Sequence, residues 1–121
     1  IENKKEIEEY LISEIVIEPV DKDKLESVIK ELKNKIKIEG FESVAINLSI
    51  SDSATRSGDL GWINENQISK KLKTVIINTP VGKISESILL PEGILIFKIR
   101  NKRNHINQLY RFFIYRSNSF I

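Results

Sequence analysis

The sequence contains no cysteine and a single histidine, His105. Without cysteine the chain can form no disulfide and offers no thiolate for nucleophilic chemistry or metal ligation, which suits any compartment, an oxidising one included. A conventional zinc site needs more histidine or cysteine than this chain has. No pair of carboxylates stands in a hydrolase or metal-binding pattern either, so we expect neither a metal nor a cofactor.

Long apolar runs are missing as well, because no run approaches the roughly 18 residues that a helix needs to cross a bilayer. No basic and apolar targeting segment stands at the start, and the chain begins at Ile1. We interpret it as a fragment or a processed chain. Its 121 residues, 40% of them hydrophobic and 30% charged, have the composition of one folded domain.

Acidic residues are absent from Ile94 to the C-terminus, although the net charge of the whole chain is only +2. In residues 101–121 the arginines are interleaved with aromatic residues, namely Tyr110, Phe112, Phe113, Tyr115 and Phe120. Such a pattern can bind single-stranded nucleic acid or an anionic membrane. It can also pack on another part of a longer chain. We favour that interpretation, so nucleic acid is not the expected partner.

The first half of the chain predicts one strand and two helices. Residues 10–18 (YLISEIVIE) are rich in isoleucine and valine and end at a proline, which predicts a central strand covered on both faces. A helix capped by Asp21 or Asp23 then runs to about residue 38 on the evenly spaced apolar residues Leu25, Val28, Ile29, Leu32 and Ile36. Gly40 is expected to end it in a left-handed cap. A second short helix follows on Phe41, Val44, Ala45 and Leu48.

The second half predicts a loop, a helix and two strands. Residues 51–61 have the composition of a loop, and residues 65–78 form a helix with Ile68, Leu72, Val75 and Ile76 turned inward. The Thr-Pro pair that follows stops this helix. Residues 84–90 and 94–99 are expected to be strands joined by a tight Pro-Glu-Gly turn. The order β-α-α-loop-α-β-β is a compact α+β arrangement without an internal repeat.

Glycine and tryptophan are scarce, yet two of the five glycines and the only tryptophan fall together in SGDLGW, residues 57–62. EIVIEP (14–19) precedes this stretch and VGKISESI (81–88) follows it. Together these stretches resemble the parvulin family of peptidyl-prolyl isomerases, from about Tyr10 to Arg103. The likeness looks greatest to the parvulin domains of SurA-like periplasmic chaperones. Ser87 stands where the family usually has proline.

This resemblance implies a parvulin-like (FKBP-like) α+β fold, with a small antiparallel sheet of about four strands wrapped by about three to four helices. It divides the chain into an N-terminal flank (1–9), a parvulin-like domain (10–103) and a basic aromatic tail (104–121) of unclear fold. In the glycine loop the backbone can turn sharply. Asp59 is expected to accept backbone N–H bonds there, with Leu60 and Trp62 anchoring the loop.

Isomerising an X-Pro bond means crossing a barrier of about 18–20 kcal/mol with no nucleophile or cofactor. It takes an apolar pocket for the proline ring and polar groups that favour the twisted amide. The resemblance implies two histidines beneath this pocket and a cysteine or aspartate in the loop after the second helix. In this chain the histidine positions fall on Glu14 and Leu95, and the loop position falls on Asp52 or Ser53. The catalytic positions are therefore present, but both histidines are replaced.

The apolar part of the family pattern is retained. Its pocket methionine and phenylalanine fall on Ile68 and Leu72, and the resemblance implies that Leu60 borders the same groove. Arg56 lies beside it in the polar loop. These residues are the expected substrate-binding set.

The resemblance therefore implies a parvulin-like domain of a periplasmic chaperone that binds unfolded or extended polypeptides, X-Pro peptides and outer-membrane protein precursors, with isomerase activity weak or lost. Two alternatives stay open: an active X-Pro isomerase, and nucleic-acid or anionic-surface binding through the basic tail. Glu14 is expected either to bond a hydroxyl or backbone group or to act as a substitute polar group. His105 is expected to be solvated.

Overall fold

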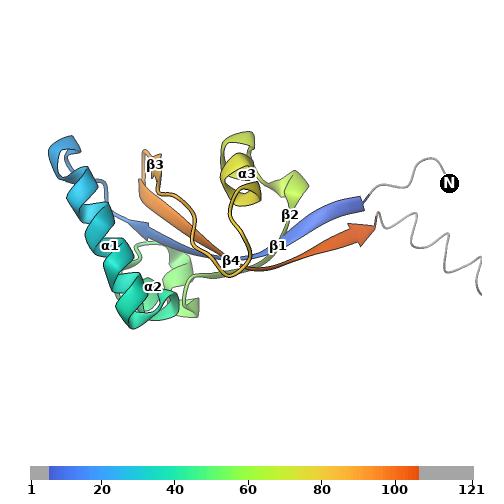
Figure 1. Cartoon of the computed structure of the whole chain (residues 1–121), viewed down its shortest axis with the longest axis horizontal. Coiled ribbons are helices and arrows are strands. Elements are labelled where there is room, and N and C mark those ends of the chain that lie inside the picture. The colour runs from blue at the N-terminus through green and yellow to red at the C-terminus, as the bar shows by residue number, and fades with distance from the viewer. Residues whose placement is uncertain (1–5, 107–121) are drawn as a thin grey trace, which may run out of the picture.

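The computed structural model describes residues 6–106, in which four strands form one antiparallel sheet and three α-helices pack on it (Figure 1). The strands are β1 (Glu6–Ile17), β2 (Asp59–Asn64), β3 (Ile88–Leu90) and β4 (Gly93–Ile106). The helices are α1 (Leu25–Glu39), α2 (Phe41–Leu48) and α3 (Lys70–Ile77). The strand order β2-β1-β4-β3 confirms the expected α+β fold and its small antiparallel sheet.

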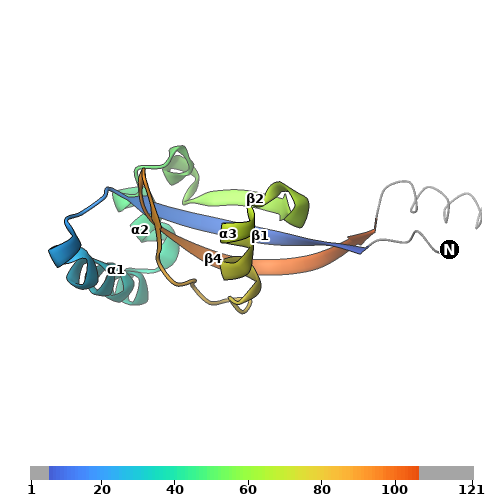
Figure 2. The ribbon, with the colours of Figure 1, turned by 90° about the horizontal axis from the view of Figure 1, so that it is seen from above.

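Strand β1 lies inside the sheet between β2 and β4, as the apolar run at residues 10–18 predicted. It pairs with β4 from Glu6 opposite Ile106 to Ile17 opposite Ile94. Both strands are longer than predicted. The domain boundaries expected after residues 9 and 103 therefore fall within β1 and β4. The pair extends past the helices as a two-stranded ribbon (Figures 1 and 2). Residues 107–121 of the basic tail lie outside the described residues.

The two faces of the sheet carry separate apolar clusters, because alternate residues of a strand point to opposite sides. One cluster, here called the α3 core, lies under α3; its buried members are Tyr10, Ile12, Ile76, Ile88, Leu95, Phe97 and Ile99. The other, the α1–α2 core, lies on the opposite face; its buried members are Ile15, Leu32, Ile36, Phe41, Val44, Ala45 and Ile96. The sheet is therefore covered on both faces.

The ends of α1 differ from the prediction. A 3-10 turn (Lys22–Lys24) precedes the helix, and Asp21, which stands at the cap of this turn, makes no capping bond with its side chain. Gly40 does end α1 with a positive φ of 92°, but its ψ of 149° is extended rather than left-handed helical. This geometry lets α2 begin at the next residue. Leu48, predicted to face inward from α2, is 41% exposed.

The segment predicted as a loop contains regular structure. Residues 51–61 form a 3-10 turn (Asp52–Arg56) and the start of β2. The predicted helix at 65–78 is split into a 3-10 turn (Glu65–Gln67) and α3. The split has a local cause, because the side chain of Ser69 accepts a bond from the Leu72 amide and so begins a new helix.

The predicted strand at 84–90 is shortened to β3, with Ile84 making only an isolated bridge to Lys98. Between them the Ser85 hydroxyl accepts the Phe97 N–H at 2.9 Å, so a side chain takes part in the pairing with β4. Among the described residues no helix is long and apolar enough to cross a membrane.

Candidate functional site

The two positions that the family pattern gives to histidine lie on the α3 face of the sheet. Glu14 of β1 is paired with Phe97 of β4, and Leu95 of β4 is paired with Val16. Directly paired residues share a face; Phe97 and Leu95 belong to the α3 core, and Val16 packs against it. Leu95 is only 3% exposed, so it presents no polar group to a substrate. Glu14 is partly exposed.

Two serine hydroxyls hold the carboxylate of Glu14. Ser51 Oγ donates to Glu14 Oε2 at 2.5 Å, and Ser53 Oγ donates to the same oxygen at 2.7 Å. Ser53 is 2% exposed, so this bond is shielded from water. The prediction that Glu14 bonds a hydroxyl group is confirmed.

Ser51 was not among the residues that the sequence singled out. The only signal was the alternation of serine at 49, 51 and 53 beside the glycine loop. The first of these also contributes, because Ser49 Oγ accepts the Val16 N–H at 3.0 Å. The three serines therefore attach the segment before the glycine loop to the open edge of β1.

The glycine loop closes against β1 at the same place. The Glu14 N–H donates to the Gly58 carbonyl at 2.8 Å, and Gly58 has a φ of +81°. A Cβ at this position would stand 2.3 Å from the Glu14 carbonyl oxygen, so the approach requires glycine. Asp59 accepts the Gly61 N–H at 2.7 Å and also pairs with the Arg100 guanidinium. The expectation that Asp59 holds the loop is confirmed.

The three residues expected to border an apolar groove pack against the same core cluster. Leu60, Ile68 and Leu72 are all partly exposed and pack against the α3 core. They come from β2, from the segment before α3 and from α3 itself. We refer to these three side chains as the apolar surface. It lies on the same face of the sheet as Glu14.

Other residues of the expected site lie outside this arrangement. Asp52 and Arg56 are exposed on the 3-10 turn, and within residues 6–106 neither side chain makes a hydrogen bond or ion pair. Trp62 pairs with Leu11, while its neighbour Ile63 packs against the α3 core, so the indole points to the opposite face. Leu60 and Trp62, which were expected to anchor the glycine loop together, therefore lie on opposite faces of the sheet. The side chain of His105 lies outside what the structure describes.

The Trp62 ring is covered instead by Arg103 of β4, whose guanidinium carbon lies 3.9 Å from the ring centroid. Arg103 Nε also donates to Glu9 Oε1 at 2.8 Å. A cation over the indole face is attracted by the ring and limits its contact with water. These contacts join β4 to β2 and β1, and they lie away from the α3 face.

Two titratable groups have shifted pKa values. Burial raises the pKa of Tyr10, and the nearby carboxylates of Glu8 and Glu65 raise it further. The pKa of Glu42 is lowered, chiefly by the hydrogen bond from its own backbone N–H at the start of α2 and also by Lys98. Neither group belongs to the cluster formed by Glu14, Ser51 and Ser53, here called the Glu14 cluster. Within the described residues no group of three or more histidine, cysteine, aspartate or glutamate side chains is placed to hold a metal.

Comparison with protein families agrees with this arrangement. A family model described as Rotamase, the PPIC-type PPIase domain, matches residues 15–101. That range contains the last three residues of β1, the segment with Ser49, Ser51 and Ser53, the glycine loop, α3 and most of β4. The chain belongs to this family, the parvulin-type peptidyl-prolyl isomerase domains, and is similar to SurA chaperones.

Among individual proteins, the chain is 30% identical over 103 residues to Chaperone SurA of Hydrogenovibrio crunogenus, covering 79% of this chain and 23% of that protein. It is 31% identical over 90 residues to the foldase protein PrsA of Bacillus subtilis, covering 74% of this chain and 30% of PrsA. A crystal structure of a PpiC-type isomerase domain superposes with a TM-score of 0.66 at 27% identity, covering 79% and 92% of the two chains. The chain thus spans a quarter or less of the first SurA relatives it matches.

Proposed function

We propose that this domain binds extended or unfolded polypeptide on the α3 face of its sheet, and that its isomerase activity is weak or lost. The observation that carries the proposal is the pair of replacements at the histidine positions. Glu14 is a carboxylate with one oxygen already bonded to two hydroxyls, and Leu95 is buried in the α3 core. Neither can reproduce a pair of neutral, hydrogen-bonded imidazoles beneath the proline.

Binding does not need the histidines. The apolar surface can cover the ring of a proline or another apolar side chain, and burying one such side chain contributes roughly 1.5–3 kcal/mol. Ordering a flexible peptide offsets much of this gain, so we expect dissociation constants that are micromolar or weaker. Weak and general binding suits a chaperone that must release its clients.

The cellular setting is also a proposal. The similarity to SurA chaperones supports a periplasmic role in handling unfolded polypeptides, with precursors of outer-membrane proteins as clients. X-Pro segments of such clients are the natural ligands of the α3 face. The absence of cysteine is compatible with an oxidising compartment.

The second candidate is an active X-Pro isomerase, and the Glu14 cluster is the observation that favours it. Ser51, Ser53 and Glu14 supply polar groups on the face of the sheet that carries the apolar surface, and Asp52 and Arg56 add charge on the adjoining turn. Polar groups at this place can stabilise a twisted amide if a substrate reaches them. Nucleic-acid binding by the tail would depend on residues outside those described.

The deciding experiment measures cis-trans exchange of X-Pro tetrapeptides by NMR, with binding of the same peptides followed by chemical shifts. The 121-residue chain is compared with a parvulin domain that carries both histidines. We expect binding with little or no acceleration of exchange. Acceleration equal to that of the comparison domain would contradict the proposal and establish the second candidate.

A further inference from the structure

Glu14 is one of two partly exposed acids in the described part of the chain, with Glu8, that take part in no ion pair. The ion pairs found among residues 6–106 join Lys73 to Glu65, Lys98 to Glu42, Arg100 to Asp59 and Arg103 to Glu9. Glu14 takes part in none of them, although Arg56 stands on the turn that holds its serine partners. Its negative charge is therefore balanced by hydroxyl dipoles alone.

The serines leave one side of the carboxylate open. Both hydroxyls donate to Oε2, and within the described residues Oε1 has no hydrogen-bond partner. A carboxylate has about four acceptor positions on its two oxygens, so Oε1 can accept a donor from a ligand. Because Oε2 is held from two sides, the carboxylate is fixed before a ligand arrives, which lowers the entropy cost of using it.

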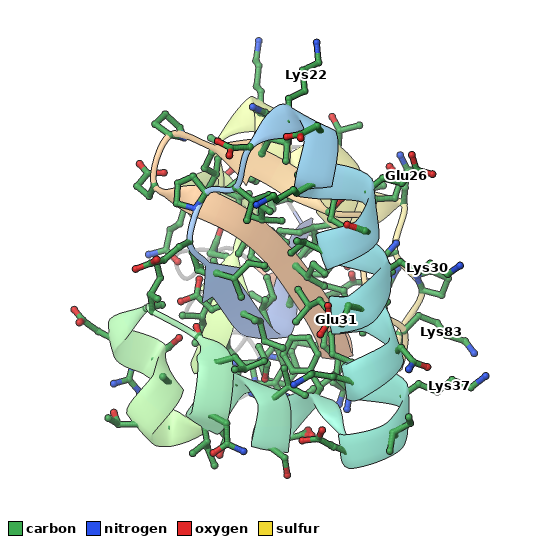
Figure 3. The ribbon with its side chains drawn as sticks, turned by 90° about the vertical axis from the view of Figure 1, so that its left-hand side faces the viewer. Lys22, Glu26, Lys30, Glu31, Lys37 and Lys83 are labelled. Carbon is green, nitrogen blue, oxygen red and sulfur yellow. The ribbon has the colours of Figure 1, made fainter. Side chains whose placement is uncertain are left out.

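The surroundings of Glu14 reduce the screening of its negative charge. Ile12 and Val16 flank it along β1 and Phe97 lies opposite on β4; Ile12 and Phe97 belong to the α3 core, and Val16 packs against it. Apolar neighbours lower the local dielectric, so the field of the carboxylate is less screened than on an open surface. The labelled lysines of α1 do not compensate it, since Figure 3 shows them extending outward on the α1 side of the molecule.

We infer that the α3 face selects peptides with a lysine or arginine next to the proline and discriminates against an acidic residue there. This inference rests on the proposed peptide binding by the apolar surface and names the substrate class of that site. The proline ring lies on the apolar surface, and the neighbouring ammonium or guanidinium group donates to Glu14 Oε1. An acidic neighbour meets a fixed carboxylate without a counter-ion, which gives selectivity by repulsion as well as attraction.

The test uses three tetrapeptides, identical except for lysine, glutamine or glutamate before the proline. Binding of each to the whole chain is measured by NMR titration, and exchange of the X-Pro bond is recorded in the same samples. We expect the lysine peptide to bind about two- to fivefold more tightly than the glutamine peptide, the range that a partly exposed ion pair supplies, and the glutamate peptide to bind most weakly. Added salt should bring the three affinities together.

The variant Glu14→Gln keeps an acceptor for the serines but removes the charge, so the three peptides should bind it equally. The matched control is Glu26→Gln, which makes the same change in net charge on the outer side of α1 (Figure 3). It should keep the preference for lysine. A wild-type chain that binds all three peptides equally overturns the inference and leaves the proposed function standing. A chain that neither binds nor isomerises any of them overturns both.

Discussion

At the scale of single residues, Gly58 allows the glycine loop to lie against β1 and so places Ser53 beside Glu14. Its φ of +81° is unfavourable for any other residue, and a Cβ would also meet the Glu14 carbonyl oxygen at 2.3 Å. The contact joins the backbone of Gly58 to the backbone of Glu14, so no flexible side chain can move aside to make room for a Cβ. The loop therefore tolerates no side chain at this position.

We expect Gly58→Ala to lower the free energy of unfolding by more than about 2 kcal/mol, measured by urea denaturation. The control is Gly61→Ala, since Gly61 also has a positive φ (+73°) but no atom stands within 4 Å of the place its new methyl group would occupy. That variant should lose only about 1 kcal/mol, the cost of the backbone conformation alone. Equal losses would show that the close approach to Glu14 adds no strain.

Glu42 supplies a second prediction at this scale, one that depends on pH. Its carboxylate has a pKa below the usual 4.5, and the Lys98 ammonium lies 3.3 Å from Oε1. The folded state therefore favours the charged form. This contribution is fully present above the unfolded-state pKa and is lost as the pH falls through the folded-state pKa. Half of the Glu42 side chain is exposed, so the contribution is small.

We expect Glu42→Gln to be slightly less stable than the wild type at neutral pH and equally stable in acid below the folded-state pKa. Urea denaturation at the two pH values measures this difference. Glu92→Gln, in the exposed turn between β3 and β4, is the control and should match the wild type at neutral pH. A deficit of Glu42→Gln that persists unchanged in acid would contradict the assignment.

At the scale of elements, α3 shows how a short helix is held in place. Eight residues do not form a stable helix in water by themselves, so its stability comes from the face it buries. The adjacent residues Ile76 and Ile77 make this visible, since the first is 2% exposed and the second 57%. Only Ile76 belongs to the α3 core.

We expect Ile76→Ala to lower the free energy of unfolding by about 2–5 kcal/mol, because it leaves a cavity in the α3 core. Ile77→Ala removes the same atoms from an exposed position and should change stability by no more than about 0.5 kcal/mol. Denaturation of the two variants in parallel makes the comparison. Similar losses in the free energy of unfolding would mean that α3 does not pack on the sheet through Ile76 as the structure shows.

At the scale of the whole molecule, the sheet separates two surfaces with different chemistry. The α3 face carries the apolar surface and the Glu14 cluster, whereas the opposite face is covered by α1 and α2 (Figure 2). Among the ion-paired basic residues of β4, Arg103 pairs with Glu9 in the ribbon, Lys98 pairs with Glu42 of α2 and Arg100 pairs with Asp59 of the glycine loop. Peptide binding at the α3 face and peptide binding at the basic tail can therefore be distinguished in two ways: by which residues show chemical-shift changes, and by whether those changes persist at high salt.

A titration with an uncharged, aromatic-rich unfolded peptide tests this separation. We expect weak binding, micromolar or weaker, with chemical-shift changes at Leu60, Ile68 and Leu72 that persist at high salt, since burial of apolar area is not screened. The Trp62 indole lies on the opposite face and serves as the internal control, with little change expected. Changes confined to residues 103–116 that vanish with salt would show instead that the tail is the binding element.

Local patterns in the sequence were sufficient for the fold class and for much of the site. Glycines 58 and 61 around Asp59 and Leu60 require a particular backbone, and that requirement is readable without any knowledge of the rest of the molecule. The apolar spacing of α3 likewise predicted which of its residues face the sheet. The family pattern then placed Glu14 and Leu95 at the histidine positions, and both lie on one face as the pattern requires.

The tertiary structure alone decided the contacts that give the site its character. Ser51 meets Glu14 across 37 positions of the chain, a partnership that no local pattern can show. The face on which Trp62 lies depends on strand register, which shifts in β1 between Ile12 and Ser13, and a shift of one residue reverses every side chain beyond it. The ribbon is longer than its apolar pattern because charge pairs such as Arg103 with Glu9 join the two strands where apolar residues are few. Local propensity and glycine placement thus determined the elements, whereas register and long-range pairing determined which side chains meet.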